Sequence, residues 1–381
     1  MIKRMVLGCG CFFLLLACHQ SRGQDNAKTK QTAPSVPKEL TPRPFTLQQK
    51  DISLAKALAE LTKQTGNEVE DRRQVKDETP ISVSVKNVTF WQGLDAIAKA
   101  ADARVSIYEK DGKAALVDGP NKAIAVSYSG LFRITVNRLD LIHVLDTDNH
   151  TCLIFLDVAW EPRFQPILLE TQPEDLVVQD DKGNAVEVPE APKGPAPIGR
   201  RLAAQVQMRV DAPRRSAQQL GLLKGKLRIA GPSEMLTFTF DKLRKIGNSK
   251  EALKESQSGV AVHLHELRTE GENEEQIWTI GLLLEYPADG PKFESFQSWL
   301  GNNEIYLEKE KDGLKQRFPP NLGYETDDQT DDKAIIRYRF GDEPDKNLNL
   351  GKVSDWKLVY RTPGRITEIP VPFEFKDVPL P

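Results

Sequence analysis

The chain has 381 residues, with 52 Lys or Arg and 55 Asp or Glu, so its formal net charge is -3 at pH 7. Its basic residues are spread along the sequence. It therefore has no bulk attraction for polyanions, which excludes nucleic acid from the expected partners. At about 150 residues per domain, this length predicts two or three domains.

Residues 1–18 have the pattern of an export signal. Two basic residues, at positions 3 and 4, precede an apolar run from Val6 to Ala17, whereas a membrane-spanning helix needs roughly 20 apolar residues. The run ends in Leu15-Leu16-Ala17-Cys18, which resembles a bacterial lipobox. This resemblance implies that Cys18 carries a lipid that tethers the exported protein to the periplasmic face of a membrane. Ordinary cleavage after Ala17, followed by secretion, is the alternative.

The cysteines are consistent with export and limit the chemistry that can follow. Cys9 and Cys11 lie in the predicted signal, and Cys18 is the predicted lipid attachment site. Cys152 is therefore the one remaining thiol, and no intramolecular disulfide is expected. It begins the apolar run 152–156, which predicts a buried strand and an inert core cysteine.

Residues 19–44 are predicted to be a linker. They include four prolines, at positions 34, 37, 42 and 44, and almost no large apolar residue. Such a segment cannot bury enough apolar surface to fold. As a flexible coil it would reach roughly 25 to 30 Å, enough to hold a folded domain clear of lipid headgroups.

Residues 45–119 are predicted to form a compact α+β module. Apolar residues recur at helical spacing between Ser53 and Thr65, with Ser53 as the N-cap and Gly66 just past the end. A second helix begins at a capping box formed by Thr89 and Gln92. Strands are expected at residues 45–50, 81–85, 105–108 and 114–117, with a further short strand near 68–70.

The helical motifs of this module carry a resemblance. The segments 52–61, 65–67 and 81–97 look like the short N-terminal domain shared by secretins and TonB-dependent receptors, including Lys56-Ala57-Leu58 in the first helix and Gly93-Leu94-Asp95-Ala96-Ile97 in the second. The resemblance implies a periplasmic assembly or signalling module that binds other proteins. Neither a secretin channel domain nor a receptor barrel follows in this sequence, so the module would serve for contacts alone.

The remainder predicts two mainly-β domains. Many short apolar runs separated by Gly, Pro and Asp predict a β-sandwich over residues 122–241 and a second over 259–381. A polar, partly helical connector is expected at 242–258. The segments 359–364 and 369–381 look similar to the C-terminal module of bacterial envelope proteins. The predicted fold is thus a small α+β module followed by two immunoglobulin-like sandwiches.

The sequence contains no recognised catalytic or cofactor-binding motif. Residues 221–227 superficially resemble a phosphate-binding loop, but their glycines are one residue too close and Leu227 stands where Ser or Thr must hold magnesium. The segment is expected to be a turn that leads into a strand. No nucleophile elbow, zinc-protease helix or penicillin-binding motif is present in the sequence. We therefore expect no catalytic residue and no cofactor.

Two kinds of side-chain cluster raise the question of a metal. His263 and His265 would share one face of a strand, but no third ligand is evident beside them. Acidic connections contain residues that calcium favours, without the spacing or central glycine of an EF-hand loop: Asp146, Asp148 and His150, and Asp327, Asp328, Asp331 and Asp332. The expectation is a solvated strand face and solvated acidic turns, with no metal.

Three aromatic residues, Phe293, Phe296 and Trp299, recur at a three-residue spacing that would line one face of a short helix. Exposed, they would form an interaction surface for a protein or a glycan. Buried, they would fill the core of the last domain, and large aromatics carry most core area.

These observations predict an exported, lipid-tethered cell-envelope protein that acts as a non-catalytic interaction or assembly module. Its expected partners are the membrane, through the lipid on Cys18, and another envelope protein. The alternative is an exported enzyme or carbohydrate-binding protein that works through the loops of a sandwich. That alternative requires convergent acids in a pocket, or exposed aromatics near Trp299.

Overall fold

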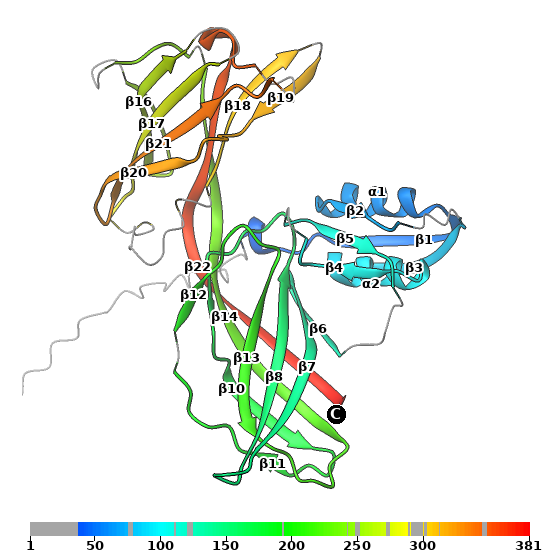
Figure 1. The fold of residues 1–381 in the computed structure, drawn as a ribbon. Coiled ribbons are helices and arrows are strands. Elements are labelled where there is room, and N and C mark those ends of the chain that lie inside the picture. The colour runs from blue at the N-terminus through cyan, green and yellow to red at the C-terminus, as the bar shows by residue number, and fades with distance from the viewer. Residues whose placement is uncertain are drawn as a thin grey trace, which may run out of the picture. The chain divides into compact units, whose positions relative to one another are not determined.

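The computed structural model describes residues 37–74, 79–109, 112–119, 125–192, 194–241, 243–247, 252–271, 275–288, 290, 300, 303–311, 313–344 and 349–381. Across these residues the protein is mostly β, with several sheets and two α-helices (Figure 1). The predicted β-rich fold is confirmed at this level. None of the helices in these ranges is long and apolar enough to cross a membrane. The predicted signal, Cys18 and most of the linker lie outside the described residues.

The two α-helices form where the caps predicted them. Helix α1 (Leu54–Thr65) follows Ser53, whose side chain accepts a hydrogen bond from the backbone N–H of Lys56. The helix ends at Gly66, whose φ of 75° suits glycine. Helix α2 (Phe90–Ala100) begins with the predicted capping box at Thr89. Both helix predictions are confirmed, because the signals that start and stop a helix are local in sequence.

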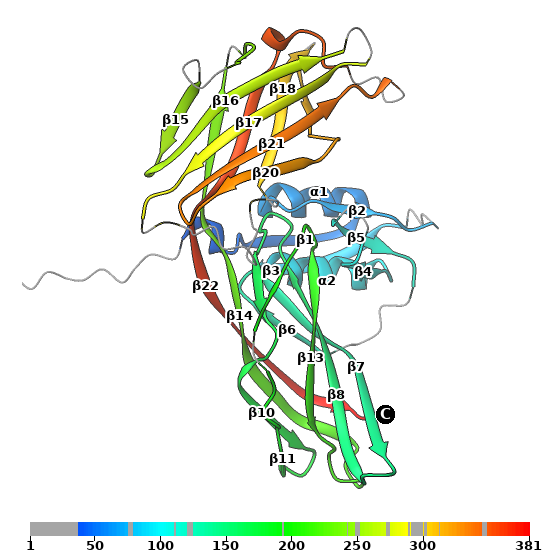
Figure 2. The same ribbon diagram turned by 60° about the vertical axis from the view of Figure 1, so that its left-hand side comes forward.

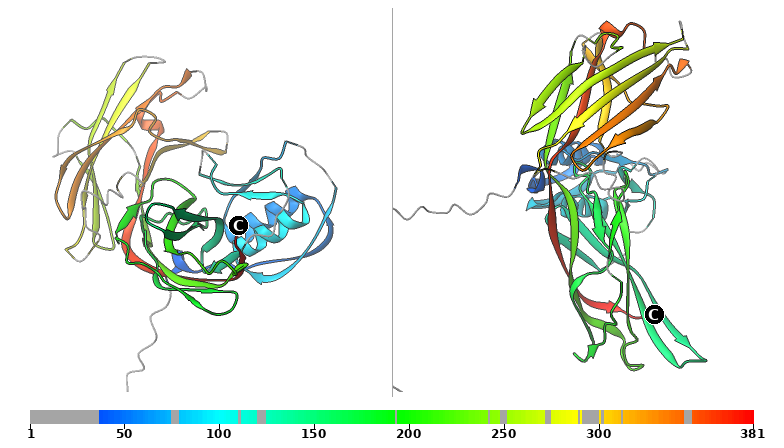
Figure 3. Two further views of the ribbon diagram at one scale, coloured as in Figure 1. Left: turned by 60° about the horizontal axis from the view of Figure 1, so that its bottom comes forward. Right: turned by 90° about the vertical axis from the view of Figure 1, so that its left-hand side faces the viewer.

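Two small sheets flank these helices. Strand β1 (Phe45–Ile52) pairs antiparallel with β3 (Ile81–Val88), and β5 (Ala114–Val117) lies between β2 (Val69–Asp71) and β4 (Arg104–Ser106). Each helix contacts strands of both sheets, so the helices lie between them and pack side by side (Figure 3). The predicted order of elements, including the extra short strand β2, is confirmed.

The other sheets are larger. A four-stranded sheet has the order β13-β8-β7-β6, and a five-stranded sheet has the order β15-β16-β17-β21-β20. An eight-stranded sheet runs β11-β10-β14-β22-β18-β19, with β9 paired to β14 and β12 paired to β9. The strands are β6 (Val126–Ser129), β7 (Phe132–Val144), β8 (Asn149–Trp160), β9 (Leu168–Glu170), β10 (Glu174–Asp180), β11 (Ala185–Val186), β12 (Pro195–Pro197), β13 (Ala203–Asp211), β14 (Gln219–Phe240), β15 (Leu253–Gln257), β16 (Val260–Glu270), β17 (Ile277–Glu285), β18 (Glu304–Lys311), β19 (Leu314–Phe318), β20 (Tyr324–Gln329), β21 (Lys333–Gly341) and β22 (Lys357–Pro379). Short 3-10 helices occupy Lys38–Leu40 and Val353–Asp355.

The longest strands, β14 and β22, pair with each other along their whole length (Figure 2). The sequence predicted many short strands separated by Gly, Pro and Asp, and β14 contains Gly231 and Pro232. In the structure these residues stay in β14, and the register shifts beside them, between Pro232 and Met235, mark bulges. Residues 253–257 are a strand rather than part of the polar, partly helical connector that was predicted.

The buried apolar residues form two cores. Core 1 contains the interior of the α+β module together with residues of β7, β8, β13 and the first part of β14. Core 2 contains residues of β16, β17 and β21 and the second part of β14. Strand β22 contributes to both, with Val371 and Phe373 in core 1 and Leu358 and Tyr360 in core 2. The domain limits remain predictions. Strands β14 and β22 each contribute residues to both cores.

Candidate functional site: an open strand edge on the α+β module

A groove runs along the α+β module between strand β1 and helix α1. Its volume is about 530 Å³, and every residue that lines it belongs to one of these two elements: Thr46, Leu47, Gln48, Gln49, Ile52, Lys56, Ala59, Glu60 and Gln64. Leu47 and Ile52 are buried, whereas Gln48, Gln49 and Lys56 are exposed. The groove therefore combines an apolar base with polar walls.

Strand β1 has an open edge on this groove. Its sheet contains only β1 and β3 among the described residues, so backbone groups that point away from β3 have no partner strand there. Hydrogen bonding alternates along an antiparallel strand. Thr46 points its N–H and C=O away from β3, and so does Gln48, because Leu47 between them pairs toward Val85.

A glutamine side chain already imitates a pairing strand at one end of this edge. The amide of Gln64 on α1 accepts a hydrogen bond from the N–H of Thr46 (3.0 Å) and donates one to its C=O (3.1 Å). These are the two bonds that a neighbouring strand would make to this residue. The edge is therefore closed at Thr46 and open from Gln48 onward.

The module is fixed to the four-stranded sheet by a shared core and by polar contacts. Trp91 is fully buried, and its indole N–H donates to the C=O of Leu131 (3.1 Å). Asn67 donates to the carboxylate of Glu161 (3.0 Å) and accepts from the N–H of Arg163 (3.0 Å). The module that carries the groove is thus joined to the four-stranded sheet by buried contacts.

Glu161 is the buried charged group of this junction. Its residue surface is fully buried, one carboxylate oxygen contacts Arg163 (2.6 Å), and the other oxygen has no hydrogen-bond partner. Burial raises the pKa of this carboxyl above its usual range, although Asn67 and Arg163 act in the opposite direction. The carboxylate holds the junction together at an electrostatic cost.

A second cleft, of about 980 Å³, lies beside β4, β6 and β7 and contains acids. Asp95 accepts hydrogen bonds from Tyr128 (2.6 Å) and Arg133 (2.8 Å). Burial, and then the charge of Asp95, raise the pKa of Tyr128. Asp157 is similarly bound by Tyr108, Asn137 and Gln205. These carboxylates already serve as hydrogen-bond acceptors within the fold, which leaves them less suited to act as general acids or bases.

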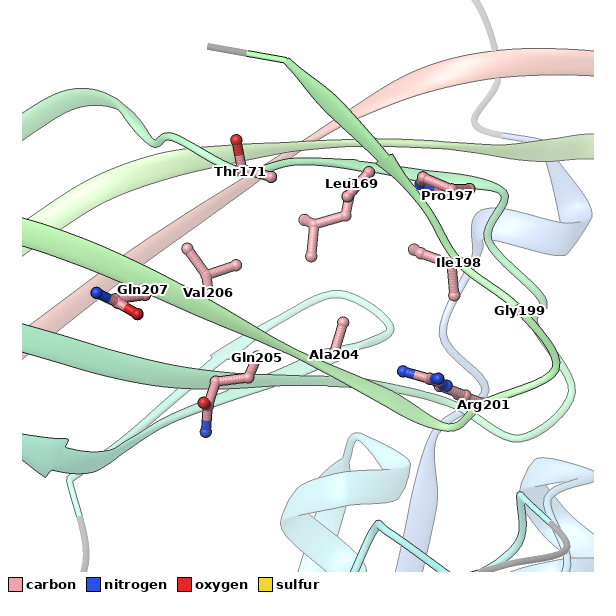
Figure 4. Close-up of a pocket in the computed structure, with 11 residues that line it drawn as sticks. Leu169, Thr171, Pro197, Ile198, Gly199, Arg201, Ala204, Gln205, Val206 and Gln207 are labelled. Carbon is pink, nitrogen blue, oxygen red and sulfur yellow. The ribbon is translucent and has the colours of Figure 1, made fainter. Parts of the chain in front are cut away.

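A third pocket, of about 290 Å³, lies between β9, β12 and β13 (Figure 4). Leu169, Ile198, Ala204 and Val206 surround it, while the amides of Gln205 and Gln207 point away. The lining contains one ionisable side chain, Arg201, and no carboxylate. This pocket is a small apolar gap in the packing and lacks the convergent acids that the enzyme alternative requires.

Several residues singled out by sequence lie elsewhere. Two sets of residues lie outside the described residues. They are the predicted lipid attachment site Cys18 and the aromatic residues Phe293, Phe296 and Trp299, for which both burial and an interaction surface were considered. Cys152 is buried, and burial raises the pKa of its thiol to about 11. Residues 221–227 lie within β14 rather than in the expected turn.

His263 and His265 both lie on β16, and a register shift in the pairing with β17 falls at His265. Nε2 of His263 lies 3.1 Å from the carboxylate of Glu285. In the described structure, Nε2 of His265 is buried and makes no hydrogen bond. Burial lowers the pKa of His265. No third metal ligand joins them in the described part of the chain.

The two acidic segments between strands have different interaction partners. Asp327 forms an ion pair with Arg337 (2.6 Å), and Asp332 accepts a hydrogen bond from Thr330 (3.0 Å). Asp148 instead lies beside two histidines, His150 and His143. The sequence pattern grouped Asp148 with Asp146 and His150 but did not include His143, whose approach depends on strand register.

Comparisons with protein-family models, with curated proteins and with solved structures found no match to this chain. The residues and the geometry of the described part of the chain are therefore the basis for its function.

Proposed function

We propose that the protein is an exported cell-envelope protein, tethered by a lipid on Cys18, that binds another protein through the open edge of β1. In this proposal the α+β module works as the short N-terminal domain of secretins and TonB-dependent receptors does, in contacts rather than in catalysis. The β-rich remainder serves as two immunoglobulin-like sandwiches that position the module.

The observation that carries the proposal is the groove between β1 and α1. An extended peptide can add to an exposed strand, with its backbone supplying affinity and its alternate side chains supplying specificity. Gln48 offers an outward N–H and C=O for such pairing. Leu47 and Ile52 offer an apolar base, and Lys56 and Glu60 of α1 offer charged contacts.

The amide of Gln64 sets the register of the incoming strand. Because it already occupies the backbone groups of Thr46, a partner strand would begin to pair at Gln48. It would end before Ile52, because the register shift after Gln49 and the positive φ of Asp51 interrupt the edge there. An unprotected edge invites indiscriminate pairing and aggregation. The Gln64 contact shortens the available edge and so favours a specific, short partner segment.

Two proline variants test this proposal. In Gln48→Pro the edge loses the outward N–H, and no hydrogen bond to β3 is lost, because proline is tolerated where a strand's N–H faces away from its neighbour. Ser84, the register partner of Gln48 on β3, faces the opposite edge of the same sheet. Ser84→Pro is therefore the matched control.

The full chain should be crosslinked in envelope membranes and its partners identified by mass spectrometry, with circular dichroism confirming that both variants fold. We expect Ser84→Pro to recover the same specific partner as the wild type and Gln48→Pro to lose it. Recovery of an identical partner set by both variants would contradict the strand-edge proposal. Mass spectrometry of the mature N-terminus tests the tether separately, because acylated Cys18 is expected there.

A further inference from the structure

Two histidines face each other at the tip of the β7–β8 hairpin. Residues 145–148 form the turn, and the register of the strands pairs His143 directly with His150. Their rings stack with centroids 3.9 Å apart and planes inclined by 19°. Directly paired residues of an antiparallel ladder have side chains on the same face. Both imidazoles therefore project from one side of the hairpin.

Asp148 brings a carboxylate to the same place. It ends the turn with a φ of 53°, a left-handed conformation that Asp and Asn tolerate better than most residues. Its Oδ1 atom lies 2.8 Å from Nε2 of His143 and 3.4 Å from Nε2 of His150. One potential ligand atom from each residue lies within 4.8 Å of the other two.

We propose that His143, Asp148 and His150 bind one divalent transition-metal ion of the Zn²⁺ type, with water as the fourth ligand. Two imidazole nitrogens and one carboxylate oxygen, with an open fourth position, form a ligand set that zinc accepts in tetrahedral geometry. Metal–ligand bonds of about 2.0–2.1 Å place tetrahedral ligand atoms roughly 3.4 Å apart. The 3.4 Å distance from Asp148 to His150 matches that value, whereas the 2.8 Å distance from Asp148 to His143 has to lengthen. The two stacked imidazoles also have to turn, because a ring nitrogen binds a metal in the plane of its ring.

The chemistry of this cluster favours a transition metal over calcium. Calcium takes six or more oxygen ligands, whereas two of the three groups here are nitrogens. Arg214 and Arg215 also line the hollow beside the histidines. Their positive charge disfavours a cation held by charge alone, so binding has to come from coordination by nitrogen. This assignment replaces Asp146 of the predicted acidic group with His143.

A bound ion would join the two strands at a tip that also exposes apolar side chains. Leu141, Ile142 and Val144 are partly exposed on β7, and Leu145 in the turn is 84% exposed. Coordination would restrict the turn and hold these side chains in one arrangement. The site lies on strands outside the β1 groove, and it does not depend on the proposed function.

The test uses the mature full chain without a polyhistidine tag, titrated calorimetrically with ZnCl2 and, in a parallel experiment, with CaCl2. Co²⁺ is the spectroscopic probe, because tetrahedral coordination gives it intense visible absorption. Three variants remove a ligand: His143→Asn, His150→Asn and Asp148→Asn. Asn keeps the left-handed turn at position 148. Asp146→Asn changes an exposed acid of the same turn outside the cluster, and His263→Asn changes a histidine of the β16 pair.

We expect one Zn²⁺ per chain and no measurable heat with Ca²⁺. Each ligand variant should weaken Zn²⁺ binding by at least about tenfold, which corresponds to ~1.4 kcal/mol, and should remove the Co²⁺ absorption. Asp146→Asn and His263→Asn should bind as the wild type does. Absence of zinc binding, equal binding of calcium, or zinc binding that survives all three ligand variants would each overturn the proposal.

Discussion

The two ends of the β7–β8 hairpin show how burial changes the role of the same kinds of side chain. At one end, Glu161 directly follows β8 and is buried beside Asn67 of the α+β module. At the other end, Asp148 lies in an exposed turn beside two histidines. Burial raises the pKa of Glu161, whereas the hydrogen bond from His143 and the charge of His150 lower the pKa of Asp148.

The two carboxylates at the ends of this pair of strands therefore have different roles. The carboxylate of Glu161 is enclosed and serves to join two parts of the fold, because its partners come from the module and from the segment after β8. The carboxylate of Asp148 is accessible and ionised, so it remains available to a ligand. The strands fix both positions through the same ladder, from Phe132 paired with Trp160 to Val144 paired with Asn149.

The largest expected effect is at the buried end. Trp91→Ala removes a fully buried indole from core 1 and leaves the C=O of Leu131 with one hydrogen bond fewer. We expect the free energy of unfolding to fall by about 3–5 kcal/mol, as measured by chemical denaturation. The exposed-end variant His143→Ala should change it by no more than ~0.5 kcal/mol in metal-free buffer. Similar losses of unfolding free energy in Trp91→Ala and His143→Ala would contradict the claim that the buried end contributes more to stability than the exposed end.

A smaller effect is expected at Asn67. Asn67→Ala removes the donor to Glu161 and the acceptor for the N–H of Arg163, and the fully buried site admits no easy replacement. Leaving such groups unpaired should cost about 2–3 kcal/mol, as measured by urea denaturation. Asn137→Ala is a control, because Asn137 is exposed and Asp157 keeps other donors when it is removed. An equal loss in the control would show that burial of the junction is not the cause.

The smallest effect concerns pH. Glu161 has a pKa raised in the folded state, so the folded protein binds its proton more tightly than the unfolded chain does. Its contribution to stability is complete below the ordinary value of 4.5 and is lost as the pH rises through the raised folded value. Glu161→Gln removes this titration. Relative to the wild type, the variant should gain stability as the pH rises from acid to neutral.

Denaturation curves of the wild type and Glu161→Gln at several pH values provide the measurement. The difference in free energy of unfolding between the two proteins could stay constant across the acid range. That result would mean that Arg163 and Asn67 lower the pKa of Glu161 as much as burial raises it. If Glu161→Gln instead lost stability relative to the wild type as the pH rises, Arg163 and Asn67 would lower the pKa of Glu161 more than burial raises it.

Local signals account for what the sequence predicted well. The ends of both helices are specified by nearby residues, as the capping box at Thr89 and the glycine at position 66 show. Alternating apolar residues predicted most strands of the α+β module for the same reason. The uninterrupted path of β14 past Gly231 and Pro232 could not be predicted locally, because pairing with the distant β22 holds it.

The candidate sites depended on contacts that sequence spacing does not reveal. Gln64 looked like one polar residue of an amphipathic helix, and its strand-like contact with Thr46 depends on how α1 packs against β1. His143 lies near the end of β7, and the length of the turn determines that it faces His150. A hairpin with a four-residue turn at 145–148 places His143 opposite His150, so a prediction of that turn would have identified the pair.

Hydrogen exchange at the amide of Gln48 tests the central claim most directly. The full chain should be measured alone and in the complex with the envelope partner that it captures, with the amide of Ser84 as the internal reference. If a partner strand adds to β1, exchange at Gln48 slows markedly in the complex while exchange at Ser84 is unchanged. Equal exchange at Gln48 in the free and bound protein would contradict the account.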